Sequence, residues 1–201
     1  MRPASIIPGR LQCLAEIMYE FVANILDSNV GNEGKPYFPF IFTLFLFILF
    51  SNLLGLIPYS YTVTSQIIVT FAMAFTIFIG VTLIGLLKHG LHFFSFFVPP
   101  GASKPLIPLL VLIEVISYLI RPVSLSVRLF ANMLAGHTML KVFAGLAVMM
   151  SGAGGIMVAG SALPLIAIIG LTGLELLVAL LQAYVFTILT CMYLNDALHL
   201  H

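Results

Sequence analysis

The length of its apolar segments is the feature that most limits what this chain can fold into. Residues 106–150 and residues 156–194 are both mostly apolar. As α-helices they would be about 68 and about 58 Å long, whereas the hydrocarbon core of a bilayer is about 30 Å thick. Neither segment has a polar loop beside a candidate turn such as Arg121-Pro122 or Leu163-Pro164. The sequence therefore favours a hairpin of two long, steeply tilted membrane helices, separated at Ser151-Gly152-Ala153-Gly154-Gly155.

Composition places the whole chain in a membrane. Of its 201 residues, 61% are hydrophobic and 7% are charged, and the mean hydropathy is +1.17. These values exclude a soluble globular domain and are typical of a polytopic membrane protein. The net charge of +1 gives no reason to expect nucleic-acid binding. The sequence has no metal-ligand spacing, nucleotide-binding loop or nucleophile motif, so we expect no metal, no cofactor and no catalysis by this chain alone.

The remaining segments predict three further helices. Residues 11–28 have one apolar and one acidic face, which predicts an amphipathic helix over 11–30 that is too polar to span and lies at the interface or on a partner. Residues 38–57 and 65–87 have the length and composition of transmembrane helices. We expect these elements to form a single membrane domain, residues 1–201. The predicted fold class is an all-α polytopic membrane protein, with an amphipathic N-terminal helix, two transmembrane helices and then the long hairpin.

The basic residues predict the orientation of the chain. Loop 58–65 between the first two spans carries no charge, whereas Lys35 and Lys88 stand at the other ends of those spans. By the positive-inside rule, the ends that carry Lys35 and Lys88 face the cytoplasm or matrix. Loop 58–65 then faces the opposite side.

Arg128 most needs an explanation, because it lies inside the apolar stretch 106–150. Arginine stays protonated, and a charge at membrane depth costs at least about 2.5 kcal/mol, so such a residue normally lines a polar path or meets a buried anion. Asn132 follows one turn later, and Glu114 falls about 40° away round the helix, on the same face as Arg128. His137 points to about the opposite side and lies about 13 Å further along.

The second long segment adds Glu175 and Gln182, which share one helix face. A carboxylate, an imidazole and a fixed cation in one hairpin indicate a proton route, because the first two groups exchange protons near neutral pH when burial shifts them. Simpler structural interpretations stay open. His137 can hydrogen-bond a neighbouring backbone, Glu175 can pair with a basic side chain, and Gln182 can hold two helices together. Glu114 can reach an interface.

Two further ionisable residues in the long segments, Arg121 and Lys141, are interpreted as structural or interfacial. Two other classes of protein also stay open. A secondary transporter would use Arg128 to anchor a substrate carboxylate, but that class usually shows paired repeats and the sequence has none. A purely structural membrane anchor gives no reason for Arg128 at membrane depth.

Two motifs resemble the signatures of a known family. Ser124-Leu125-Ser126-Val127-Arg128-Leu129-Phe130-Ala131-Asn132-Met133-Leu134-Ala135-Gly136-His137 resembles the signature of subunit a, the stator channel of the rotary F-type ATP synthase. Leu181-Gln182-Ala183-Tyr184-Val185-Phe186 resembles the family's second signature. Leu194-Asn195-Asp196-Ala197 resembles the C-terminus of alphaproteobacterial and mitochondrial members. The similarity covers nearly the whole chain, and a long tilted hairpin is also the family's architecture.

The resemblance implies roles for the polar residues of the hairpin. Arg128 matches the family's essential arginine, which faces the rotating ring of c subunits, and Asn132 matches the polar residue one turn away. His137 and Glu175 match the two positions that form the half-channel from the periplasmic or intermembrane side. Some bacterial members carry these two residue types exchanged, which suggests that the pair acts jointly. Gln182 matches the glutamine that faces the arginine.

Glu114 matches the acidic residue near the opposite half-channel, on the cytoplasmic or matrix side. The implied function is a proton-translocating stator subunit whose two offset half-channels let proton flow turn the c-ring and drive ATP synthesis in a distant catalytic head. The implied partners are the c-ring, the peripheral stalk, other membrane-sector subunits and the lipid bilayer, with neither nucleotide nor nucleic acid bound. The implied location is the mitochondrial inner membrane or, alternatively, a bacterial inner membrane.

The chain departs from the family at its N-terminus. Family members usually have a further transmembrane helix before the amphipathic segment, and residues 1–10 alone precede that segment here. We expect that helix to be absent, lost from this gene product or replaced by another chain. The departure affects the attachment of the stator more than the proton path, which uses the C-terminal half.

Overall fold

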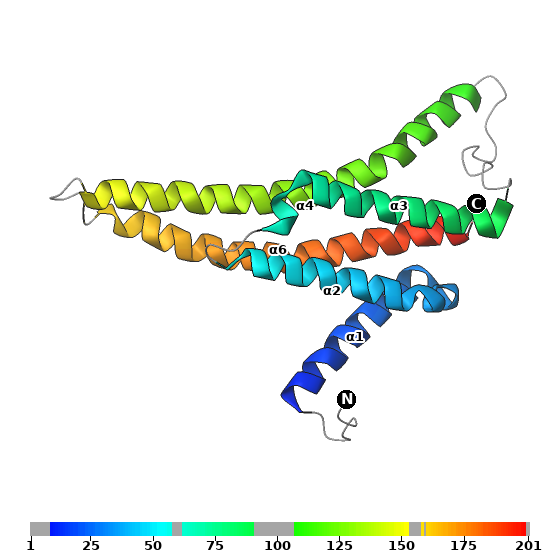
Figure 1. Cartoon of the computed structure of the whole chain (residues 1–201), viewed down its shortest axis with the longest axis horizontal. Helices are drawn as coiled ribbons and strands as arrows, with labels where there is room; N and C mark the ends of the chain where they lie inside the picture. The colour runs from blue at the N-terminus through cyan, green and yellow to red at the C-terminus, as the bar shows by residue number, and fades with distance from the viewer. Residues whose placement is uncertain (1–8, 58–61, 91–106, 153–157, 159, 200–201) are drawn as a thin grey trace. The chain divides into compact units, whose positions relative to one another are not determined.

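The computed structural model describes residues 9–57, 62–90, 107–152, 158 and 160–199. Within these ranges the regular structure consists of five α-helices and two short 3-10 helices, without a strand. In chain order the elements are α1 Arg10–Asn29, η1 Gly31–Tyr37, α2 Phe38–Gly55, η2 Val63–Ser65, α3 Ile67–His89, α4 Ile107–Gly152 and α6 Ala162–Leu198. Figure 1 colours them from blue at the N-terminus to red at the C-terminus. The predicted all-α fold is confirmed.

Four segments of the chain are long and apolar enough to cross a membrane. They are Gly31–Gly55, Ile67–His89, Ile107–Gly152 and Ala162–Leu198. Helix α1 is not one of them, because its acidic face lowers its hydropathy. The prediction of a polytopic membrane protein with an amphipathic N-terminal helix is confirmed.

Helix α6 differs most from its predicted range, residues 156–194. It begins at Ala162, and Pro164 lies in its first turn, where a missing N–H leaves no helical hydrogen bond unmade. The predicted start lies outside the described residues. The helix continues beyond its predicted end because Ala197 and Leu198 are buried. The hydropathy pattern predicts an end before the polar residues Asn195 and Asp196. The packing of Ala197 and Leu198 stabilises the helix beyond that point.

Residue contacts divide the chain into two compact units. The first comprises Met1–Phe47, Ile79–Ile116 and Tyr184–His201, and the second comprises Ile48–Phe78 and Ser117–Ala183. Each of the helices α2, α3, α4 and α6 contributes one part of its length to each unit.

In the first unit, the second half of α1 contributes the buried side chains Val22, Ile25 and Leu26. Val30, directly after the helix, is also buried. Leu14, nearer the N-terminus of the helix, is exposed. Polar contacts join three segments of this unit, since Lys88 of α3 pairs with Glu33 of η1 and the His89 ring hydrogen-bonds to the Leu198 carbonyl at 3.1 Å.

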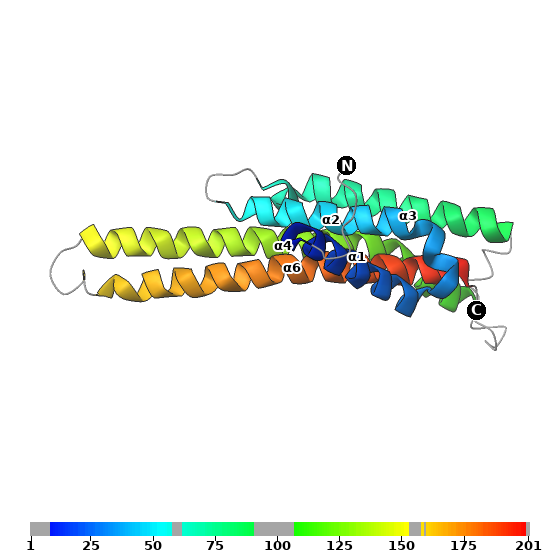
Figure 2. The ribbon, with the colours of Figure 1, turned by 90° about the horizontal axis from the view of Figure 1, so that it is seen from below.

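The second unit holds α4 and α6 side by side, as both Figure 1 and Figure 2 show. The Gln182 side chain reaches Arg128, and the Glu175 side chain reaches His137 further along α4. Residues later in α4 therefore contact residues earlier in α6, so the two helices run in opposite directions. This antiparallel pairing confirms the predicted helical hairpin. Residues 153–157 of its connection lie outside the described part of the chain.

Candidate functional site

Helices α4 and α6 carry all six predicted site residues. Arg128, Asn132 and His137 lie on the part of α4 in the second unit, and Glu175 and Gln182 lie opposite them on α6. The remaining residue, Glu114, lies on the part of α4 in the first unit, where it is half-buried. The antiparallel direction of the two helices brings the later residues of α4 to the earlier residues of α6.

His137 and Glu175 form a close pair of ionisable groups in the second unit. The Nδ1 atom of His137 lies 3.3 Å from Oε1 of Glu175. The Glu175 side chain is 4% exposed, and neither of its carboxylate oxygens makes a hydrogen bond with correct geometry to the described residues. The imidazole ring can donate a proton to this buried carboxylate or accept one from it. Few other groups stabilise either the charged or the neutral form of the carboxylate.

Gly136 makes room for the Glu175 carboxylate. A Cβ atom at Gly136 would lie 2.6 Å from Oε1 and 2.8 Å from Cδ of Glu175. Real Cβ atoms do not approach other atoms so closely, so a larger residue at this position would force the Glu175 carboxylate to shift. Sequence reasoning did not assign a role to Gly136. The signal was its place inside the first signature, directly before His137.

A second partner of His137 comes from the segment between α2 and α3. Oγ1 of Thr62 lies 2.8 Å from Nε2 of His137. The imidazole therefore contacts a carboxylate through one nitrogen and a hydroxyl through the other. Sequence reasoning missed Thr62, because it treated loop 58–65 only as an uncharged connection.

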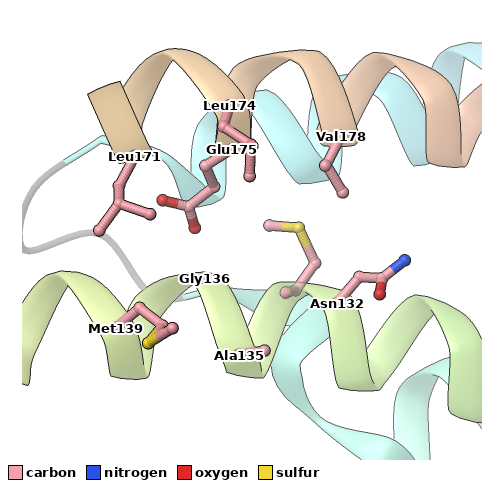
Figure 3. Close-up of a pocket in the computed structure, with 9 residues that line it drawn as sticks. Asn132, Ala135, Gly136, Met139, Leu171, Leu174, Glu175 and Val178 are labelled. Atoms are coloured by element: carbon pink, nitrogen blue, oxygen red, sulfur yellow. The ribbon is translucent and has the colours of Figure 1, made fainter. Parts of the chain in front are cut away.

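A cavity of about 230 Å³ borders the Glu175 side chain. Figure 3 shows the Glu175 carboxylate directed from α6 toward Gly136 of α4. Asn132 supplies the other polar side chain of the cavity wall. The apolar part of the wall consists of Met133, Ala135, Gly136, Met139, Leu171, Leu174 and Val178. The volume exceeds the roughly 30 Å³ share of one water molecule several times over, so the cavity is large enough for water beside an ionisable carboxylate.

Arg128 meets Gln182 through its backbone. Nε2 of Gln182 donates a hydrogen bond of 3.0 Å to the Arg128 carbonyl oxygen, and Gln182 is 6% exposed. The Arg128 side chain itself is exposed on α4, as is Asn132 one turn later. Gln182 therefore ties α6 to α4 at the arginine and leaves the guanidinium group free to point outward.

The two residues interpreted as structural lie elsewhere on α4. The guanidinium carbon of Arg121 lies 5.4 Å from the centre of the Tyr118 ring, a cation–π distance. Lys141 is exposed. Over the described ranges, no group of three or more His, Cys, Asp or Glu side chains is placed to hold a metal ion.

These features define a multi-pass helical membrane protein that carries ionisable side chains inside its apolar helices. A sequence model of the family described as ATP synthase A chain matches residues 1–195. The protein named ATP synthase subunit a from Pelagibacter ubique is 57% identical over 98% of this chain and 78% of its own length. The proteins of the same name from Rhizobium rhizogenes and Agrobacterium fabrum are each 58% identical, over 97% and 96% of this chain and 78% of their own length.

The chain therefore belongs to the ATP synthase A chain family. Membership confirms the resemblance and makes the chain a membrane subunit of the ATP synthase complex. It also sets aside the secondary transporter and the structural anchor. These relatives are alphaproteobacterial, so they support the alternative location in a bacterial membrane and do not support the mitochondrial one.

Proposed function

We propose that this chain is the proton-translocating stator subunit of a bacterial F-type ATP synthase. In this proposal it offers two offset half-channels to a ring of c subunits, and proton flow through them turns the ring. The catalytic head then makes ATP at a distance, and this chain binds no nucleotide. Its other partners are the peripheral stalk and the remaining membrane-sector subunits, and its location is the bacterial inner membrane.

The observation that carries the proposal is the contact between His137 and Glu175 beside a cavity. Imidazole and carboxylate groups both accept and release protons in the physiological range when their surroundings favour it. The 3.3 Å distance between Nδ1 and Oε1 is short enough for a proton to pass from one group to the other through one hydrogen bond of ordinary length after a small side-chain movement. The pair therefore serves as the uptake path from the periplasmic side.

Arg128 separates the two half-channels. It is exposed on α4, and a cation at membrane depth is stabilised by a facing anion. The facing anion in this mechanism is the ionised carboxylate of a c subunit, which the guanidinium attracts as the ring turns. The same positive charge repels a proton that would otherwise pass straight from one half-channel to the other.

The neutral form of the ring carboxylate travels through lipid, because protonation removes the cost of burying its charge. After nearly a full turn it loses its proton into the second half-channel near Glu114. Asn132, one turn after Arg128, and Gln182, which donates to the Arg128 carbonyl oxygen, supply polar groups that keep water near the arginine. This hydration prevents the arginine and the ring carboxylate from forming a permanent ion pair.

The test is ATP-driven proton pumping by the whole complex in sealed vesicles, with wild type compared with Arg128→Ala. We expect the variant complex to assemble and to lose coupled pumping, because no fixed cation remains to hold the ionised ring carboxylate. Arg121→Ala is the matched control, since it removes the same group from the same helix at a residue that contacts Tyr118. It is expected to pump at close to the wild-type rate per assembled complex.

A coupled Arg128→Ala complex that still synthesises ATP would overturn the proposal. Equal losses in the two arginine variants would also count against it, because they would show that any charge removed from α4 has the same effect.

A further inference from the structure

The Thr62 hydroxyl does not make the hydrogen bond that is usual for threonine at its position in the chain. It is the N-cap residue of η2, and an N-cap hydroxyl usually accepts a hydrogen bond from the first turn of the helix. Its side chain makes no such bond. The hydroxyl instead lies 2.8 Å from Nε2 of His137.

The Thr62 backbone is held independently of its side chain. The carbonyl oxygen of Thr62 accepts hydrogen bonds from the backbone N–H of Ser65 at 3.3 Å and from the Ser65 hydroxyl at 2.8 Å. These two bonds fix the turn that carries Thr62. Removal of the Thr62 hydroxyl therefore leaves the turn its own hydrogen bonds.

The methyl group of Thr62 is fixed by Gly55 at the end of α2. A Cβ atom at Gly55 would lie 2.6 Å from Cγ2 of Thr62, so the methyl group packs where a larger residue would stand. Thr62 is 8% exposed. The Thr62 side chain is therefore enclosed, with its methyl group against Gly55 and its hydroxyl group at His137.

We propose that Thr62 is a positioning residue, which holds the His137 ring so that Nδ1 faces Glu175. This inference rests on the proposed function of the His137–Glu175 pair in proton uptake. The ring lies between two contacts, 2.8 Å from Thr62 on one nitrogen and 3.3 Å from Glu175 on the other. Rotation of the ring away from Glu175 would break the bond to Thr62.

A hydroxyl group suits this task because it serves both protonation states of the ring. When the ring is protonated on both nitrogens, Nε2–H donates a hydrogen bond to the Thr62 oxygen, and the hydroxyl hydrogen turns away. After Nδ1 has passed its proton to Glu175, the ring is the neutral tautomer with its proton on Nε2, and Nε2–H still donates to the same oxygen. The proton that is passed on moves between Nδ1 and Oε1 of Glu175, and the Thr62 proton stays on its own oxygen.

The charged surroundings of the ring bear on its pH dependence. Glu175 faces it from α6, and Lys141 follows one turn later on its own helix and is exposed. From the segment between α2 and α3, the described residue that contacts the ring is the uncharged Thr62. A change at Thr62 therefore alters the orientation of the ring and adds or removes no charge.

The test compares Thr62→Val, Thr62→Ser and Thr64→Val in the whole complex in sealed vesicles, with proton pumping measured as a function of pH. Thr62→Val keeps the shape of the side chain and removes the hydroxyl, whereas Thr62→Ser keeps the hydroxyl. Thr64→Val is the matched control, because Thr64 is 1% exposed and its hydroxyl has no hydrogen-bond partner over the described ranges.

We expect Thr62→Val to slow pumping about two- to tenfold, the factor that corresponds to the net contribution of one hydrogen bond, and to shift the pH profile. Thr62→Ser restores both, and Thr64→Val changes neither. In a His137→Ala background, Thr62→Val has no further effect, because Thr62 acts through the ring. Thr62→Ala replaces Thr62→Val if the valine variant does not assemble.

A wild-type rate and pH profile in the variant without the hydroxyl would overturn the inference. Equal slowing by Thr62→Val and Thr62→Ser would also overturn it, since that result shows a packing role for the methyl group. The His137→Ala complex separates this inference from the proposed function. If His137→Ala pumps normally, the proposed proton path is wrong; if it is slow while Thr62→Val is normal, only the role of Thr62 is wrong.

Discussion

Glu175 illustrates how one side chain obtains its properties from residues on another helix. Helix α4 supplies both the histidine beside it and the glycine that leaves it space. A carboxylate that is 4% exposed is costly to keep charged unless a polar partner or water is near. His137 and the adjoining cavity provide those two means of compensation.

Replacement of either member of this pair is expected to slow proton pumping. Glu175→Gln and His137→Ala each remove a group that exchanges protons, and such groups contribute about a hundredfold or more to proton-transfer steps. We expect at least a tenfold lower rate of ATP-driven pumping, about 1.4 kcal/mol, and a changed pH profile in reconstituted vesicles. Glu20→Gln, at an exposed carboxylate of α1, is the control. Unchanged rates and pH profiles in both variants would place the proton path elsewhere.

We expect Gln182 to stabilise the structure of the site more than it contributes to proton transfer. Gln182→Leu removes the donor to the Arg128 carbonyl oxygen, and one such bond contributes about 0.5–1.5 kcal/mol. We expect a modest fall in the thermal stability of the assembled complex and a reduced, not abolished, pumping rate. The control is Gln66→Leu, since Gln66 is exposed outside the helices. A complex with wild-type stability and wild-type pumping would contradict this role.

At the scale of elements, the antiparallel pair of α4 and α6 is what assembles the site. The hydrogen bond at Arg128 and the close contact at His137 occur in one register of the two helices. Small residues on α4 permit the close approach, which is the usual way helices pack in a membrane. Gly136 is the clearest case, because its missing Cβ is where the Glu175 carboxylate lies.

Gly136→Ala is therefore expected to disturb the site, although alanine favours a helix over glycine by about 1 kcal/mol. The added methyl group would lie 2.6 Å from Oε1 of Glu175, and overpacking of this kind costs about 1–3 kcal/mol. We expect slower proton pumping at a normal level of assembly. Gly145→Ala on the same helix is the control, since nothing lies within 4 Å of its Cβ position. Similar rates in the two variants would show that Glu175 moves aside without consequence.

At the scale of the whole molecule, the chain is a multi-pass membrane subunit of an ATP synthase. Many large apolar side chains are exposed along its membrane helices, for example Leu87, Met149, Leu163 and Ile169. In a bilayer such surfaces face lipid tails or the apolar surfaces of neighbouring subunits, so their exposure is not a defect of packing.

The distribution of basic residues predicts the topology of the chain. After replacement of the native Cys13 and Cys191, we expect a cysteine at Val63 to react with a membrane-impermeant maleimide added to spheroplasts. A cysteine at Lys35 is expected to react only in inverted vesicles, because the basic end faces the cytoplasm. Both positions are exposed, so accessibility to the reagent differs only by side of the membrane. The reverse pattern would show that the charge rule fails for this chain.

The sequence by itself determined the type and approximate length of each described helix, because helix formation in a membrane depends on local hydropathy and on internal hydrogen bonds. It also determined the family, since the signatures around Arg128 and Gln182 are local. The resemblance grouped His137 with Glu175, but only the tertiary structure placed them 3.3 Å apart and showed that Gly136 makes room for the carboxylate. Thr62 could not be found from the sequence, because its contact joins residues 75 positions apart. Such contacts depend on how separate segments pack, and no local pattern encodes that packing.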